Sequence, residues 1–144
     1  EAEQAALGEK DALMSTLTEA EKAHFLRLEA SLCAEAALHF LRNCRKELDQ
    51  AQYYARNTMM TVNDGYRENT YKAAAGAQAD KCREQLEAIC ACGFPLDIHP
   101  YIQNPMGYIV TARRFGDQDQ MNLAQQGIRN TEKALKELLL QLTE

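Results

Sequence analysis

The chain has 144 residues, enough for one domain with its own hydrophobic core. Hydrophobic residues make up 46% of it and charged residues 26%, proportions that exclude a disordered or fibrous protein. The net charge is −5, and because nucleic-acid binding depends on neutralising phosphates, we expect no nucleic-acid partner. Apolar runs fall well short of the roughly 18 residues that span a bilayer, so we expect no membrane partner either.

The cysteines indicate a reducing environment. Their number is odd and several occupy apolar helical positions, which is typical of reduced, packed thiols rather than of a disulfide framework. They are Cys33, Cys44, Cys82, Cys90 and Cys92. Residues 1–20 carry acids where a signal peptide would have a basic and then an apolar region. These features predict a cytoplasmic protein.

Helical signals begin near the start of the chain. A short helix is expected over about residues 2–15, weakened by Gly8. Thr18 and Glu21 then have the spacing of a capping box, in which each residue satisfies a backbone donor of the other. After it, apolar residues recur every three or four positions, which is the pattern of one helical face. These positions are Leu26, Ala30, Cys33, Ala37, Phe40, Cys44, Leu48, Ala51, Ala55, Met59 and Val62.

This second helix is predicted to run for about 45 residues, or roughly 65–70 Å at the rise of an α-helix. We expect it to end at 63–65, where Asn-Asp-Gly favours a turn. Its first half is apolar over a wider face, so we expect that half to pack against more than one neighbour. The added positions are Phe25, Leu28, Leu32, Leu38 and Leu41. A helix of this length is expected either to bend or to project towards a partner.

Two further helices are predicted. One lies between residues 66 and 92 and is ended by Gly93 with a hydrophobe and a proline beyond it. Its apolar positions are Tyr71, Ala75, Ala79, Cys82, Leu86 and Ile89. The last helix is expected to open at Asp117 and to carry a heptad seam. That seam consists of Met121, Ala124, Ile128, Thr131, Leu135, Leu138 and Leu142. Leu139 and Leu140 add apolar surface beyond the seam, which favours a second contact.

The segment 94–116 departs from the helical pattern. It is rich in β-branched and aromatic residues, and positions 104–107 have the residues that a type I turn prefers. We predict a short β-hairpin or an ordered, packed loop there. The expected fold class is therefore all-α: an antiparallel bundle of three long helices plus a short N-terminal helix, forming one domain over residues 1–144.

The same segment contains residue types that are common in binding sites. Tyr and Arg are favoured at binding hot spots, and ordered loops on rigid scaffolds often carry function. An equally weighted alternative is that the aromatic residues only cap one end of the bundle. The candidate partner- or ligand-binding residues are His99, Tyr101, Tyr108, Arg113 and Arg114.

Cys90, Cys92 and His99 are the cluster most suggestive of metal binding, because soft thiolates and imidazole suit zinc or copper(I). The cluster lacks a fourth ligand and the spacing of a structural zinc site. Residues 90 and 92 would also point about 200° apart on a helix. One buried and one exposed thiol at a helix end is the simpler interpretation, and we expect no cofactor.

Motifs for catalysis are missing from the sequence: it has no phosphate loop, nucleophile elbow, paired catalytic carboxylates or glycine-rich nucleotide fingerprint. We therefore expect a non-enzymatic helical interaction protein, such as an adaptor, a chaperone-like protein or a regulatory subunit. It would act through exposed helix faces and the 94–116 segment on a protein partner or a second copy of itself. The alternative hypothesis is a small metal- or ligand-binding bundle that uses the Cys90, Cys92 and His99 end.

Overall fold

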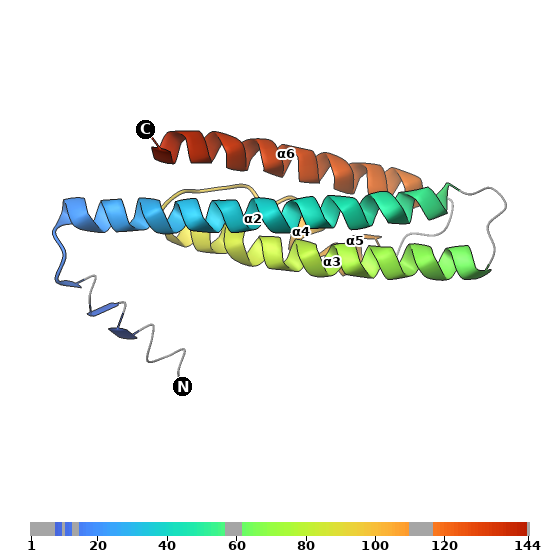
Figure 1. Ribbon diagram of the computed structural model, residues 1–144, viewed down its shortest axis with the longest axis horizontal. Coiled ribbons are helices and arrows are strands. Elements are labelled where there is room, and N and C mark those ends of the chain that lie inside the picture. Colours follow the sequence, from blue (N-terminus) through green and yellow to red (C-terminus); the bar gives the residue numbers. More distant parts are fainter. Residues whose placement is uncertain (1–7, 10, 13–14, 57–61, 110–116, 144) are drawn as a thin grey trace.

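A computed structural model describes residues 8–9, 11–12, 15–56, 62–109 and 117–143 (Figure 1). The long helices are α2 (Glu19–Ala55), α3 (Val62–Ala91) and α6 (Asp117–Thr143). Two short helices lie between the last two, α4 (Pro100–Gln103) and α5 (Pro105–Ile109). The described residues contain helices and no strand, which confirms the all-α prediction for this part of the chain. The predicted helix over 2–15 falls largely outside it, although residues 8–9 and 11–12 are helical.

Helix α2 begins at the predicted capping box. The Thr18 hydroxyl accepts a hydrogen bond from the Glu21 amide at 3.1 Å, and the Glu21 carboxylate accepts one from the Thr18 amide at 3.3 Å. The predicted end of the helix is wrong, because α2 ends at Ala55 and residues 63–65 belong to α3. Asn and Asp suit the first turn of a helix as well as the turn after one, so the Asn-Asp-Gly signal fitted either interpretation.

The end of α3 follows the prediction. Gly93 has a φ of +96°, a conformation that a residue without a side chain adopts at low cost. The Gly93 amide donates to the Cys90 carbonyl at 3.0 Å, and the Phe94 amide donates to the Ile89 carbonyl at 3.3 Å. These two bonds form a Schellman motif, which stops the helix and turns the chain back along the bundle.

The long helices lie side by side with α2 between the other two (Figure 1). Colours along the ribbon show that α2 runs opposite to both α3 and α6. The short helices α4 and α5 contact each other and both α3 and α6. They therefore occupy the position that a fourth helix would take in a four-helix bundle, and they close the side of the core that faces away from α2.

The predicted β-hairpin is wrong, because residues 100–103 and 105–109 are helical. The physical reason is a pair of cap–proline signals. His99 precedes Pro100 and its ring accepts from the Tyr101 amide at 3.1 Å. Asn104 precedes Pro105 and its side-chain oxygen accepts from the Gly107 amide at 3.2 Å. Proline at the first helical position is preorganised for a helix, so each X-Pro pair starts a short one. Residues 94–99 are the ordered loop, and residues 110–116 lie outside the described part of the chain.

The core runs along the inner faces of all these helices. Its largest fully buried side chains are Tyr101, Leu41, Leu48, Leu86, Ile89, Ile102, Met121, Ile128 and Leu135. The predicted seam of α6 is buried from Met121 to Leu138, with Leu142 packed at the edge. Many of the other buried side chains of α2 and α3 are small. They are Ala30, Ala34, Ala37, Cys44 and Ala51 from α2 and Ala75, Ala79 and Cys82 from α3.

Polar side chains fix the position of α6 along α2. Near the start of α6, the Gln125 amide donates to Asp49 at 2.7 Å and to Gln52 at 3.1 Å. Both glutamines are buried, so the bond between them forms away from water and costs more to break than a surface bond, whereas Asp49 is exposed. At the other end, the Arg27 guanidinium donates to the backbone carbonyl of Gln141 at 3.1 Å. A cation there satisfies one of the carbonyls left over at a helix C-terminus.

A substitution at Gly127 of α6 tests whether the 94–99 loop packs closely against that helix. A Cβ built on Gly127 would overlap the ring of His99, whereas one built on Gly65 in α3 meets no atom within 4 Å. We expect Gly127→Ala to lower the free energy of unfolding by about 1–2 kcal/mol, despite the better helix propensity of alanine. Gly65→Ala is the matched control and should raise it by about 0.5–1 kcal/mol. Urea unfolding of both variants gives these values, and a Gly127→Ala protein as stable as the Gly65→Ala one would contradict the packing.

Candidate functional site

Tyr101, one of the candidate binding residues, belongs to the core. Its side chain has no exposed surface, and its hydroxyl lies 3.7 Å from the Cys44 sulfur of α2. Burial, together with the neighbouring Cys44, raises the pKa of Tyr101 far above its ordinary value, so the hydroxyl stays neutral. The residue crosses the bundle from α4 to α2, and it has no surface with which to contact a partner.

His99 and Tyr108 lie partly exposed at the closed side of the bundle. The His99 ring packs edge-on against Tyr108, with 6.2 Å between ring centroids. It also lines a pocket between the 95–100 loop and α6. Its Nδ1 caps α4, which requires the neutral ring with its proton on Nε2. His99 therefore has a structural role at the junction of the loop and α4. The other two candidate residues, Arg113 and Arg114, lie outside the described residues.

The cap makes stability depend on the protonation of His99. Burial lowers the pKa of His99, so the folded chain binds this proton less readily than the unfolded chain. Stability from the neutral ring is present above the ordinary pKa near 6.5 and is lost as the pH falls through the lowered folded value. We expect His99→Ala to cost about 1 kcal/mol at pH 7.

His99→Asn is the matched variant, because asparagine caps a helix without titrating. Urea unfolding at pH 7 and pH 5 should show a smaller loss of stability on acidification for this variant than for the unchanged chain. Equal losses in the two proteins would rule out His99 as the titrating cap.

The candidate metal ligands are not brought together. Within the described ranges, the structure contains no group of three His, Cys, Asp or Glu side chains that could hold a metal ion. The Cys90 thiol donates to the Leu96 carbonyl at 3.7 Å, and Cys92 is buried. His99 uses Nδ1 for the helix cap. Each side chain thus has a structural role, and the arrangement gives a metal hypothesis no geometric support.

Burial in the core makes the thiols of two other cysteines unreactive. Burial raises the pKa of Cys44 to about 12, partly offset by the hydrogen bond with Tyr101. Burial also raises the pKa of Cys82 to about 12, with a smaller contribution from Cys44. The thiolate is the reactive form of cysteine, so both residues act as small hydrophobic side chains rather than as nucleophiles.

Alkylation measures this difference directly. At pH 8 a thiol with a pKa near 12 contains about a thousandfold less thiolate than an ordinary cysteine. We expect Cys33 and Cys90, which are partly exposed, to be modified by iodoacetamide at least about a hundred times faster than Cys44 and Cys82. Peptide mass spectrometry over a time course gives the four rates. In urea the rates should converge, and fast labelling of Cys44 in the folded chain would contradict its burial.

The surface of α2 that faces away from the bundle carries large apolar side chains. Leu28 is 53% exposed and Leu32 is 72% exposed, while Phe25 is 37% exposed. Their spacing of three and four residues places them on one helical face. An apolar hollow continues the patch towards the N-terminus. It is lined by Leu17, Ala20, Glu21, His24, Phe25 and Leu28.

The N-terminal end of α2 extends beyond the other long helices (Figure 1). Helix α2 has 37 residues against 30 in α3 and 27 in α6. Among the residues of α2, the first that is buried is Ala30. The sequence analysis grouped Leu28 and Leu32 with Leu38 and Leu41 as one widened packing face, but the described chain buries only the latter two and leaves Leu28 and Leu32 more than half exposed.

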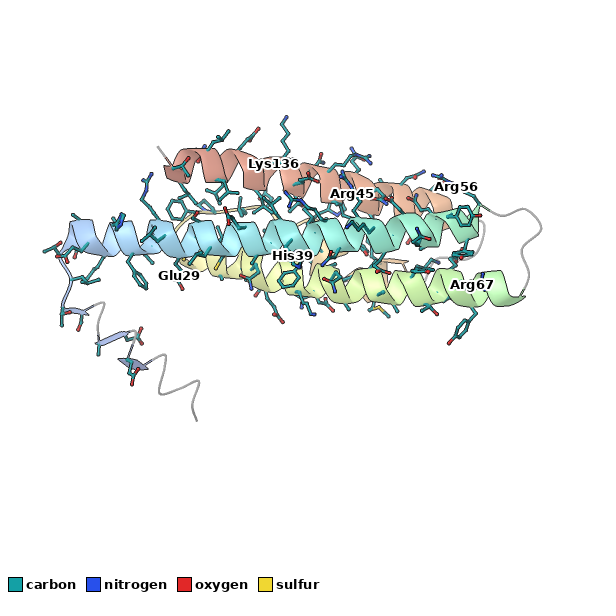
Figure 2. The ribbon with its side chains drawn as sticks, in the orientation of Figure 1. Glu29, His39, Arg45, Arg56, Arg67 and Lys136 are labelled. Atoms are coloured by element: carbon teal, nitrogen blue, oxygen red, sulfur yellow. The ribbon has the colours of Figure 1, made fainter. Side chains whose placement is uncertain are left out.

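Basic residues follow the apolar patch along α2 and continue onto α6. Figure 2 shows Arg45 between the two helices, and its guanidinium lies 3.5 Å from the Glu132 carboxylate. Lys136 contacts the same carboxylate at 2.9 Å. The hydrogen bond from Lys136, supported by the charges of Arg45 and Arg42, lowers the pKa of Glu132. This part of the surface therefore carries several cations around one carboxylate, although the chain as a whole is acidic.

Comparisons with known proteins give no match, since no protein-family model, no curated protein and no solved structure matches the chain. Across the described residues, the helices lack the length and apolarity that crossing a membrane would require. The candidate functional site is therefore defined by its own chemistry, and it is the outer face of α2 from Glu21 to Lys46.

Proposed function

We propose that this protein is a non-enzymatic helical interaction protein that docks a helix of a protein partner on the outer face of α2. The exposure of Leu28 and Leu32 carries the proposal. Leucines on a solvent-facing helix surface normally occur singly, whereas a contiguous apolar patch with a polar rim marks an interaction site.

The energy of such docking follows from the exposed area. Complete burial of a leucine side chain is worth about 1.5–3 kcal/mol, so covering the exposed parts of Leu28 and Leu32 supplies about 1–2 kcal/mol each. Association costs at least about 4 kcal/mol in lost freedom. The two leucines alone therefore give weak binding, and the hollow beside Phe25 and the charges along α2 have to contribute the remainder.

A helix is the partner element that fits this surface best. The patch is a straight ridge with residues every three and four positions, and the grooves of another helix accept such ridges. A reducing, cytoplasmic location agrees with five cysteines that form no disulfide in the structure and with two thiols that serve as core residues.

Site-specific photo-crosslinking tests the proposal. A photoreactive phenylalanine analogue replaces Leu28 in cells that naturally express the chain, and the same analogue replaces exposed Glu84 of α3 as the matched control. We expect a discrete adduct of higher mass from position 28 and none from position 84. Adding Leu32→Glu should abolish the adduct while circular dichroism shows an unchanged helix content.

The opposite results are equally clear. If position 28 gives no adduct, or gives one that Leu32→Glu leaves unchanged, the outer face of α2 is not a docking surface. If positions 28 and 84 give the same adducts, the labelling reports random collisions and the proposal fails.

A further inference from the structure

The exposed residues on the outer face of α2 form a regular stripe. Successive members are four, three, four, three, four, three and four residues apart, which is the spacing of a heptad seam. The stripe consists of Glu21, Phe25, Leu28, Leu32, Glu35, His39, Arg42 and Lys46, and every member is exposed. A heptad spacing keeps such a stripe in line with a partner helix over several turns, because two supercoiled helices share that period.

The chemistry of the stripe changes along its length. Its N-terminal end is acidic at Glu21, and Phe25, Leu28 and Leu32 after it are apolar. A second acid, Glu35, precedes the C-terminal end, which is basic at Arg42 and Lys46. Such an order is complementary to itself when reversed. Two copies of the stripe that run in opposite directions can place Glu21 of each copy near Arg42 of the other, with the leucines of both copies between these two contacts.

We propose that the partner helix is α2 of a second copy of this chain, paired antiparallel about a two-fold axis near residue 30. The proposal rests on the docking function of the outer face of α2 and names the occupant of that face. In this register Leu28 of each copy lies beside Leu32 of the other. Glu21 then faces His39, with Arg42 one helical turn further along and within reach of its carboxylate.

A two-fold axis makes the contact isologous, so every favourable pair occurs twice and the assembly closes as a dimer. A parallel pairing of the same stripes would instead set Arg42 against Arg42 and Lys46 against Lys46, which like-charge repulsion opposes. The bundle leaves room for the antiparallel pair, because α3 and α6 flank α2 away from the stripe and the N-terminal end of α2 extends past both (Figure 1).

Sedimentation of the full chain over a concentration series at low salt tests the dimer. We expect a monomer–dimer equilibrium with a dissociation constant of about 1–100 μM, weakening as salt screens the charged ends. Leu32→Glu should abolish the dimer. Arg42→Glu should weaken it by about tenfold, because it sets two carboxylates together at each end.

A compensating pair of charge reversals identifies the register. Adding Glu21→Lys to Arg42→Glu should restore the dimer to within about threefold of the unchanged chain. This rescue cannot come from general stabilisation, since Glu21 also belongs to the capping box of α2 and its replacement by lysine weakens that cap. Lys133→Glu on α6 is the matched control: an exposed cation outside the stripe, whose reversal should leave the dimer unchanged.

A chain that stays monomeric up to about 1 mM would overturn the dimer. A photo-crosslinked adduct from position 28 with the mass of a different protein would, in that case, leave the docking function intact and assign the surface to another partner. A dimer that survives Leu32→Glu, or one that the double reversal fails to restore, would overturn the antiparallel pairing of α2.

Discussion

The close contact between α2 and α3 is the constraint on which the remaining structure depends. Its helices bury small residues such as Ala34, Ala37 and Cys44 of α2, interspersed with Leu41 and Leu48 at the same spacing. Small side chains let two backbones approach closely, but they bury little apolar area each, so such a seam needs length to be stable. The pairing therefore extends along most of α3, and it uses only one narrow side of α2.

A narrow seam leaves the remaining sides of α2 to other contacts. One side accepts α6, whose larger residues Met121, Ile128 and Leu135 fill the space that the small seam leaves. Helices α4 and α5 close the side of the core opposite α2. Tyr101 of α4, the largest fully buried side chain, fills much of the space there. Each of the two short helices begins at a proline, and Pro105 starts α5 so soon after Pro100 that α4 is limited to four residues.

Sequence patterns predicted the parts of the fold whose signals are local and redundant. The capping box at Thr18 and Glu21, the stop at Gly93 and the heptad seam of α6 each combine several residues that point to one structure. The predicted helix end at residues 63–65 and the predicted β-hairpin within 94–109 were wrong, because turn residues also serve as helix caps. The sequence also did not predict which apolar side chains of α2 are exposed to solvent. The periodicity marked Leu28 and Leu32 as apolar, but only the packing of α3 and α6 on the other sides of α2 shows that the described chain leaves the two leucines uncovered.

The two faces of α2 differ in a way that periodicity alone does not reveal. The inner face of α2 carries buried alanines and a buried cysteine, which pack against other helices of the same chain. The exposed residues of the outer face recur at heptad spacing, but their chemistry changes along the helix from an acid at Glu21 to leucines and then to bases at Arg42 and Lys46. A complementary surface for this order would be basic where α2 is acidic and acidic where α2 is basic. Reversal supplies that complement. In the dimer that we propose, a second copy of α2 running in the opposite direction presents the required order.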